Sequence, residues 1–116
     1  MHNPTKPTTP VTIGETTYQL LFDFEAIATA EDLTGRPLLT GLSKKDFATP
    51  TISLVRAMLY ACLLPTQPQV TMDDVKGLIT RKNLYVVWGT VISAWAAGMS
   101  EPEEDQIALD PTVGQS

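Results

Sequence analysis

The chain has very little of the chemistry on which most enzymes depend. It contains one histidine, His2, and one cysteine, Cys62, among 116 residues. A histidine-dependent triad and a zinc site both need more such residues than this. The sequence also has no glycine-rich phosphate loop. We therefore expect no catalytic, cofactor-binding or metal-binding residues, and a protein that is not an enzyme.

The lone cysteine excludes an internal disulfide bond and fits a reducing compartment. Cys62 stands between Ala61 and Leu63 in an apolar run. A nucleophilic thiol needs a base and electropositive surroundings, so we interpret Cys62 as a structural thiol. The N-terminal residues show no basic segment followed by an apolar one, so no signal peptide is expected. These features predict a cytoplasmic protein.

Residues 1–100 carry no excess of either charge, because they hold eight acidic and eight basic side chains. The net charge of −5 comes from five acids in a C-terminal segment without a base. They are Glu101, Glu103, Glu104, Asp105 and Asp110. Neither part attracts phosphate, so nucleic acid is not an expected partner. A hydrophobic content of 43% and a mean hydropathy of +0.02 are those of a globular domain.

The stretch Leu84–Met99, LYVVWGTVISAWAAGM, carries no charge and holds both tryptophans. Leu84, Trp88, Val91 and Trp95 recur at steps of four and three, which predicts an apolar helical stripe. A membrane span needs about 20 apolar residues, so we do not expect one. A helix that is apolar nearly all round must be covered nearly all round. It either runs through the centre of the domain or receives part of its cover from another molecule.

Another side of this helix carries small residues, Gly89, Ser93 and Ala96–Ala97, which would let a second helix approach closely. The natural partner is the other charge-poor helix, at 51–64. Together the two helices predict a surface for a partner or for self-association, and a homo-oligomer. The candidate residues of this surface are Tyr60, Trp88, Trp95 and Met99.

Prolines at every third position predict that residues 1–10 form a flexible Pro/Thr arm. Apolar residues then alternate with polar ones through residue 22, across a turn at Gly14-Glu15. This pattern predicts a β-hairpin with one apolar face. The edges of such a hairpin could add strands from a neighbouring copy.

Asp23 is expected to cap a helix that runs to about Thr34, with Phe24, Ile27 and Ala30/Glu31 spaced along it. Glu25, Glu31 and Asp32 are expected in or near its outer face. Gly35 is the expected stop of this helix.

Leucines at 38–42 indicate a short helical turn, and residues 43–46 a polar loop. The next helix, at 51–64, is expected to be capped by Thr49, with Pro50 at the tolerated first position.

Thr71 and Asp74 form a capping box at the start of a short helix. This role accounts for Asp74 better than a metal pair with Asp73, because adjacent helical residues point about 100° apart. Asn83 is expected to cap the last helix. The chain is thus predicted to be a small α+β protein, mainly helical, with an N-terminal hairpin and four to five helices. Residues 11–99 form the domain and 100–116 a disordered acidic tail.

The helices expected at 72–80 and 84–98 can also be compared with a DNA-binding helix-turn-helix. A recognition helix presents polar or basic side chains to bases and phosphates. The second helix offers Thr90 and Ser93 and no base. A small regulatory DNA-binding protein is therefore the less favoured alternative.

Two signatures resemble a known family. The run YQLLFDFEAIATAEDLTGRPL, residues 18–38, contains Phe22-Asp23-Phe24 leading into Ala26-Ile27. Pro68 followed by residues 70–75, VTMDDV, forms the second signature. Both resemble the tail assembly chaperones of long non-contractile-tailed phages and related gene transfer agents, and the likeness spans about residues 11–99. The arm and the acidic tail are not part of it.

The resemblance implies a protein of the infected host's cytoplasm that binds the tape-measure protein until tail-tube subunits polymerise around it. It implies absence from the finished virion, and many relatives also have a longer frameshifted form. A chaperone for an elongated apolar client needs exposed apolar surface and several copies. The alternative from another class is a virion structural part, such as a tube or connector subunit.

Overall fold

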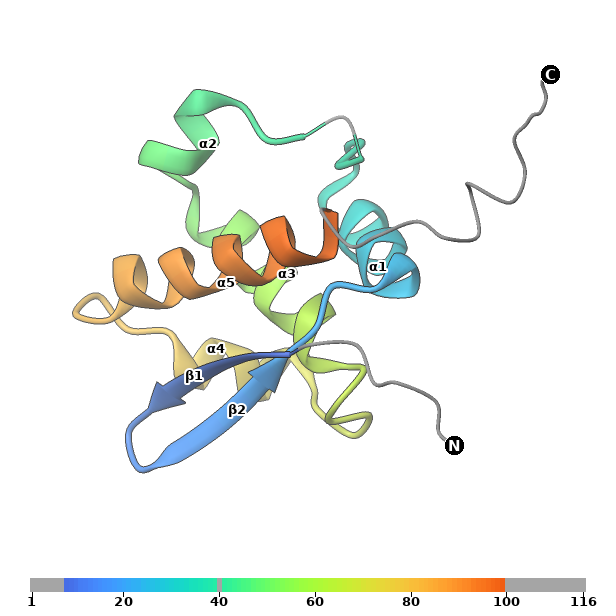
Figure 1. Ribbon diagram of the computed structural model, residues 1–116. Coiled ribbons are helices and arrows are strands. Elements are labelled where there is room, and N and C mark those ends of the chain that lie inside the picture. The colour runs from blue at the N-terminus through green and yellow to red at the C-terminus, as the bar shows by residue number, and fades with distance from the viewer. Residues whose placement is uncertain (1–7, 40, 100–116) are drawn as a thin grey trace, which may run out of the picture.

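The computed structural model describes residues 8–39 and 41–99. A two-stranded antiparallel hairpin precedes five helices, which confirms the predicted small α+β fold (Figure 1). The elements are β1 (Thr9–Ile13), β2 (Thr16–Leu20), α1 (Phe24–Thr34), α2 (Lys44–Ala48), α3 (Ile52–Leu63), α4 (Met72–Leu78) and α5 (Leu84–Met99). Since β1 begins at Thr9, the last residues of the expected arm belong to the hairpin. Residues 1–7 of the arm and the acidic tail lie outside the described residues.

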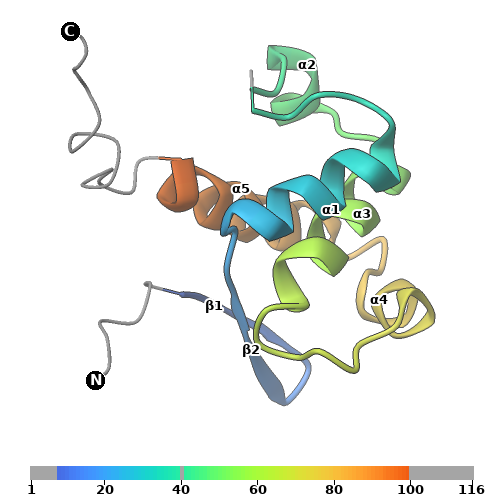
Figure 2. The same ribbon diagram turned by 90° about the vertical axis from the view of Figure 1, so that its right-hand side faces the viewer.

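Helix α3 is the centre of the fold. It contacts α1, α4, α5 and β2, and eight of its twelve residues are buried. Helix α5 lies against α3 as an outer layer and buries only Val87, Trp88, Val91 and Ala94 (Figures 1 and 2). The sequence left open whether residues 84–99 run through the centre of the domain. They do not, because α3 occupies the centre.

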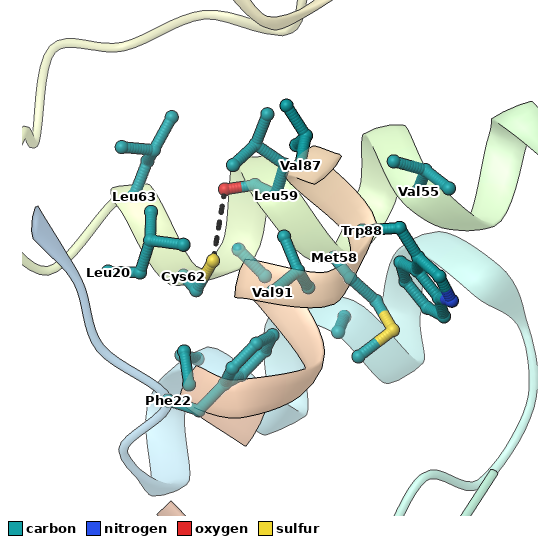
Figure 3. Close-up of a cluster of buried hydrophobic side chains, with 14 of the residues drawn as sticks. Leu20, Phe22, Val55, Met58, Leu59, Cys62, Leu63, Val87, Trp88 and Val91 are labelled. Atoms are coloured by element: carbon teal, nitrogen blue, oxygen red, sulfur yellow. Dashed lines mark hydrogen bonds between the residues drawn. The ribbon is translucent and has the colours of Figure 1, made fainter. Parts of the chain in front are cut away.

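The core joins the hairpin, α3 and α5. Leu20 and Phe22 enter it from the end of β2, and Met58 and Val91 meet them from the two helices (Figure 3). Cys62 is fully buried there, and its Sγ donates to the Leu59 carbonyl oxygen at 3.4 Å. Burial raises the pKa of this thiol. The prediction of Cys62 as a structural thiol is confirmed by its place in the core.

The hairpin closes at the predicted turn, with Gly14 at φ +66°. Val11 and Leu20 face the core. Thr12 and Thr17 face outward as a cross-strand pair, and their hydroxyl oxygens are 2.8 Å apart. The alternation expected for a hairpin with one apolar face is confirmed.

The edges of the hairpin lack some of the groups that could pair with another strand. On the β2 side, the Leu21 N–H donates to the Cys62 carbonyl oxygen at 2.9 Å. The Thr66 hydroxyl donates to the Gln19 carbonyl oxygen at 2.7 Å. On the other side, β1 contains Pro10, which has no N–H to donate. Strand addition from a neighbouring copy therefore cannot use these groups.

Both predicted ends of α1 are confirmed. The Asp23 carboxylate accepts from the Ala26 N–H at 2.8 Å, and Gly35 ends the helix in the left-handed region at φ +70°. Phe24, however, is 70% exposed, and Ala26, Ile27 and Ala30 form the buried side. Phe24 lies about 120° around the helix from the middle of that side, so it does not share the buried side with Ile27.

The interpretation of residues 38–49 is wrong in two respects. The described residues of the expected turn, 38–39 and 41–42, are not helical, and α2 begins where a polar loop was expected. Ser43 and Asp46 form a capping box, with the Asp46 N–H donating to the Ser43 hydroxyl at 3.1 Å and the Ser43 N–H to the Asp46 carboxylate at 3.0 Å. A Ser-x-x-Asp pattern in a polar segment can begin a helix, because the two side chains satisfy free backbone N–H groups at the helix start.

The cap of α3 is Thr51 and not Thr49. The Thr51 hydroxyl accepts from the Leu54 N–H at 3.1 Å, whereas the Thr49 N–H donates to the Lys45 carbonyl oxygen and ends α2. Pro50 precedes the cap and separates the two helices.

The capping box of α4 is confirmed. The Asp74 N–H donates to the Thr71 hydroxyl at 3.1 Å, and the Thr71 N–H to the Asp74 carboxylate at 3.0 Å. Asn83 does not cap α5 with its side chain. Its amide oxygen accepts from the Thr80 N–H at 2.7 Å and its amide nitrogen donates to the Leu78 carbonyl oxygen at 2.9 Å. Asn83, which precedes α5, is therefore hydrogen-bonded to the end of α4 and to the turn that follows it.

Candidate interaction surface

Helix α2 stands over one side of α5 and is attached through aromatic contacts (Figure 1). The Trp88 indole N–H donates to the Phe47 carbonyl oxygen at 3.1 Å. The Phe47 and Trp95 rings meet edge to face, with centroids 6.3 Å apart. No residue of α2 is buried, and 41% of Phe47 is exposed. We call Phe47 and Trp95 the aromatic edge.

Two carboxylates hold the chain between α1 and α2. Glu31, which the sequence placed near the outer face of α1, accepts from the backbone N–H groups of Leu38 at 2.7 Å and Leu39 at 3.3 Å. Asp46 forms an ion pair with Arg36. The hydrogen bond from Arg36, together with that from Ser43, lowers the pKa of Asp46 to about 2. Sequence reasoning missed both roles because each joins residues seven or more positions apart.

The Arg36–Asp46 pair predicts a defined pH dependence. The folded-state pKa of Asp46 is below its usual value of 3.8, so its contribution to stability is full above about pH 4 and disappears as the pH falls through about 2. We expect Arg36→Gln to lower the free energy of unfolding by about 0.5–1 kcal/mol at pH 7. This value is small because 40% of the Arg36 side chain is exposed and water screens the pair. Urea unfolding of both proteins at pH 7 and pH 2 should show the difference only at pH 7, and a difference that persists at pH 2 would contradict this assignment.

The outward side of α5 carries no charge along its whole length. Five of its residues are exposed and fall within an arc of about 100°. They are Tyr85, Val86, Gly89, Ser93 and Ala96, which we call the α5 outer face. Tyr85 is 61% and Val86 69% exposed. None of the described elements covers this face, because α5 is the outer layer here (Figures 1 and 2).

The close approach that small residues were expected to allow occurs elsewhere on α5. A Cβ placed on Gly89 would have no heavy atom within 4 Å. A Cβ on Gly98 would lie 2.2 Å from the Phe22 carbonyl oxygen. The glycine that permits tight packing within the described chain is therefore Gly98, and the segment that approaches it follows β2 and is not a helix.

The structure does not gather the four candidate surface residues into one patch. Trp88 is only 3% exposed and belongs to the core, because its ring packs among the residues between α3 and α5 (Figure 3). Trp95 and Met99 are partly buried on α5. Tyr60 is partly buried on α3, about 200° around that helix from Met58, which faces the core. Trp88 thus cannot contact a partner directly.

Exposed apolar side chains that the sequence did not single out are more accessible than these four. The large ones are Phe24, Leu33, Leu39, Phe47, Ile52, Tyr85 and Val86. An exposed Phe47 could have been suspected from the Ser43–Asp46 capping box, because a five-residue helix has too few positions to bury a full stripe.

Within residues 8–39 and 41–99 no three His, Cys, Asp or Glu side chains come together as metal ligands would. None of the described helices has the length and apolar character needed to cross a bilayer. Comparison with family models, characterised proteins and solved structures finds no match for this chain.

Proposed function

We propose that this protein is a non-enzymatic tail assembly chaperone that binds the tape-measure protein and helps to recruit tail-tube subunits in the host cytoplasm. One observation supports the proposal most directly. Helices α2 and α5 both present exposed apolar side chains, Phe47 on α2 and Tyr85 and Val86 on the uncharged 16-residue α5. The signatures at residues 18–38 and 68–75, which resemble this family, support the same role.

The aromatic edge is the part of this surface best suited to an elongated apolar client. Phe47 projects from a short helix without buried residues, and Trp95 and Met99 lie partly exposed on α5. Covering the exposed part of Phe47 removes about 80 Å² of apolar area from water, which contributes about 2 kcal/mol to binding. An apolar face of a tape-measure helix that lies along α5 would contact all three side chains.

The test is co-expression of the full chain with the tape-measure protein encoded in the same genome, followed by affinity purification and measurement of the dissociation constant. We expect a complex whose affinity falls about tenfold in Phe47→Ala. Phe24→Ala is the matched control, since Phe24 is also an exposed phenylalanine but lies on α1. Circular dichroism would show that both variants remain folded. Absence of a complex with the wild-type chain would contradict the function, and equal losses in both variants would contradict the role of the aromatic edge.

A second measurement separates the proposal from a structural role in the virion. A chaperone of this kind leaves before the tail is complete, so mass spectrometry of purified particles should not detect it. A tube or connector subunit would be present in many copies. Detection at stoichiometric amounts would overturn the proposed function.

A further inference from the structure

Helix α2 is loosely attached to the domain. None of its residues is buried, and it lies apart from the other helices in both views (Figures 1 and 2). Three polar or aromatic contacts join it to the rest of the described chain. Two are with α5, where the Trp88 indole N–H donates to the Phe47 carbonyl oxygen and the Phe47 ring meets the Trp95 ring. The third is the ion pair between Asp46 and Arg36, whose side chain is 40% exposed.

The backbone hydrogen bonds that shape α2 are internal to residues 43–49. Ser43 and Asp46 form the capping box at its start, and the Thr49 N–H donates to the Lys45 carbonyl oxygen at 2.7 Å at its end. Displacement of this segment therefore breaks no backbone hydrogen bond of α3 or α5. A segment with few buried apolar contacts separates from a folded domain at a low cost in free energy.

Both indole rings of the protein contact this segment. Trp88 is 3% exposed, and its Nε1 lies 3.1 Å from the Phe47 carbonyl oxygen, so this edge of its ring faces α2. The Trp95 Nε1 is buried and has no hydrogen-bond partner in the described chain. A buried N–H group without an acceptor is unfavourable, because it has lost its hydrogen bond to water and gained no other. The arrangement with α2 in place thus includes an unsatisfied donor next to Phe47.

We propose that residues 43–49 form a movable cover, which we call the α2 cover. In the closed form, which the structure shows, Phe47 lies against Trp88 and Trp95 on α5. In the open form the α2 cover leaves α5 while α1, α3, α4 and α5 stay packed together. Water then reaches the indole N–H groups of both tryptophans and satisfies the donor of Trp95.

Opening of the α2 cover is a property of the chain alone and does not depend on the proposed function. With the cover closed, Trp88 is out of reach of any partner. With the cover open, the nitrogen edge of Trp88 joins Trp95 as accessible aromatic surface. For a protein that binds an apolar client, the cover would set how much of this surface the client meets.

The experiment is hydrogen exchange of the full chain, followed by NMR at low concentrations of urea. We expect the Trp88 indole N–H to have a protection factor at least tenfold lower than those of the backbone N–H groups of Met58 and Leu59, which are fully buried in α3. Local opening exposes little surface, so the exchange rate of Trp88 should not change with urea. The rates of Met58 and Leu59 should rise, because their exchange requires global unfolding. Equal protection and an equal urea dependence of all three groups would overturn the proposal.

Two substitutions distinguish local opening from global unfolding. Val75→Ala in α4 removes a fully buried side chain, so it should speed the exchange of the α3 backbone groups at least tenfold. It should leave the exchange of the Trp88 indole N–H within about twofold of wild type, since both the closed and the open form contain the packed α4. Equal acceleration of the two kinds of group would show that Trp88 exchanges only on global unfolding and would overturn the proposal.

Phe47→Ala tests what keeps the α2 cover closed. It removes the ring that meets Trp95 but keeps the carbonyl oxygen that accepts from Trp88, so we expect the Trp88 indole N–H to exchange at least tenfold faster. Phe24→Ala is the matched control, because Phe24 is an exposed phenylalanine on α1 and should leave this rate unchanged. An unchanged rate in Phe47→Ala, or equal rates in both variants, would contradict the α2 cover. Client binding is measured separately, so either proposal can fail while the other stands.

Discussion

Replacing Phe22 by alanine is expected to lower the free energy of unfolding by about 3–5 kcal/mol. Phe22 is 1% exposed and fills the space between the end of the hairpin, α3 and α5 (Figure 3). Removing its ring loses the burial of the aromatic surface and leaves a cavity among Leu20, Met58 and Val91. Urea unfolding followed by circular dichroism measures the loss. If the variant does not fold, Phe22→Leu should remain folded, with a loss of about 1–2 kcal/mol.

Phe24→Ala is the control for this prediction. The two phenylalanines are separated by one residue, but 70% of Phe24 is exposed on the outer side of α1. We expect its substitution to change the free energy of unfolding by no more than about 0.5 kcal/mol. Equal losses in the two variants would show that Phe24 and not only Phe22 supports the core, contrary to the structure.

Gly98→Ala is expected to destabilise the fold by about 2 kcal/mol or more, with a fall in melting temperature of about 10 °C. The new Cβ would lie 2.2 Å from the Phe22 carbonyl oxygen and 3.1 Å from the Phe22 Cβ. Because the nearest atom belongs to the backbone, rotation of a side chain cannot relieve the contact. Either the end of α5 or the segment after β2 must move, and both help to close the core.

The matched substitution is Gly77→Ala. Gly77 is also helical, but no heavy atom lies within 4 Å of its Cβ position. An exposed helical glycine gains about 0.5–1 kcal/mol on replacement by alanine, because the unfolded chain loses conformational freedom. Thermal unfolding should therefore shift in opposite directions for the two variants. A gain of stability in Gly98→Ala would contradict the packing of α5 on Phe22.

One side of α5 packs on the domain and the other is exposed. Trp88, Val91 and Gly98 lie on the side that packs onto α3 and the Phe22 segment. Gly89 and Ser93 lie on the exposed side. Substitutions on the first side should lower the free energy of unfolding, whereas those on the second should change it by no more than about 0.5 kcal/mol.

Local features of the fold could be predicted from the sequence because the interactions behind them span few residues. The Asp23 cap, the Gly35 stop, the Gly14 turn and the Thr71–Asp74 box each depend on groups within about four positions of one another. The bounds of α5 could be predicted for the same reason, since its composition changes sharply at both ends. The aromatic edge could not be predicted, because Phe47 meets Trp95 across 48 positions of the chain.

Only the tertiary structure decided which helix is central and which side of each helix is covered. Helices α3 and α5 are both poor in charge, so periodicity predicts a buried stripe on each without saying what lies against it. Packing from α1, α4, α5 and β2 places α3 inside and leaves the outer face of α5 free. The same packing buries Phe22 and exposes Phe24, because burial depends on which distant elements meet a side chain and not on its neighbours in the sequence.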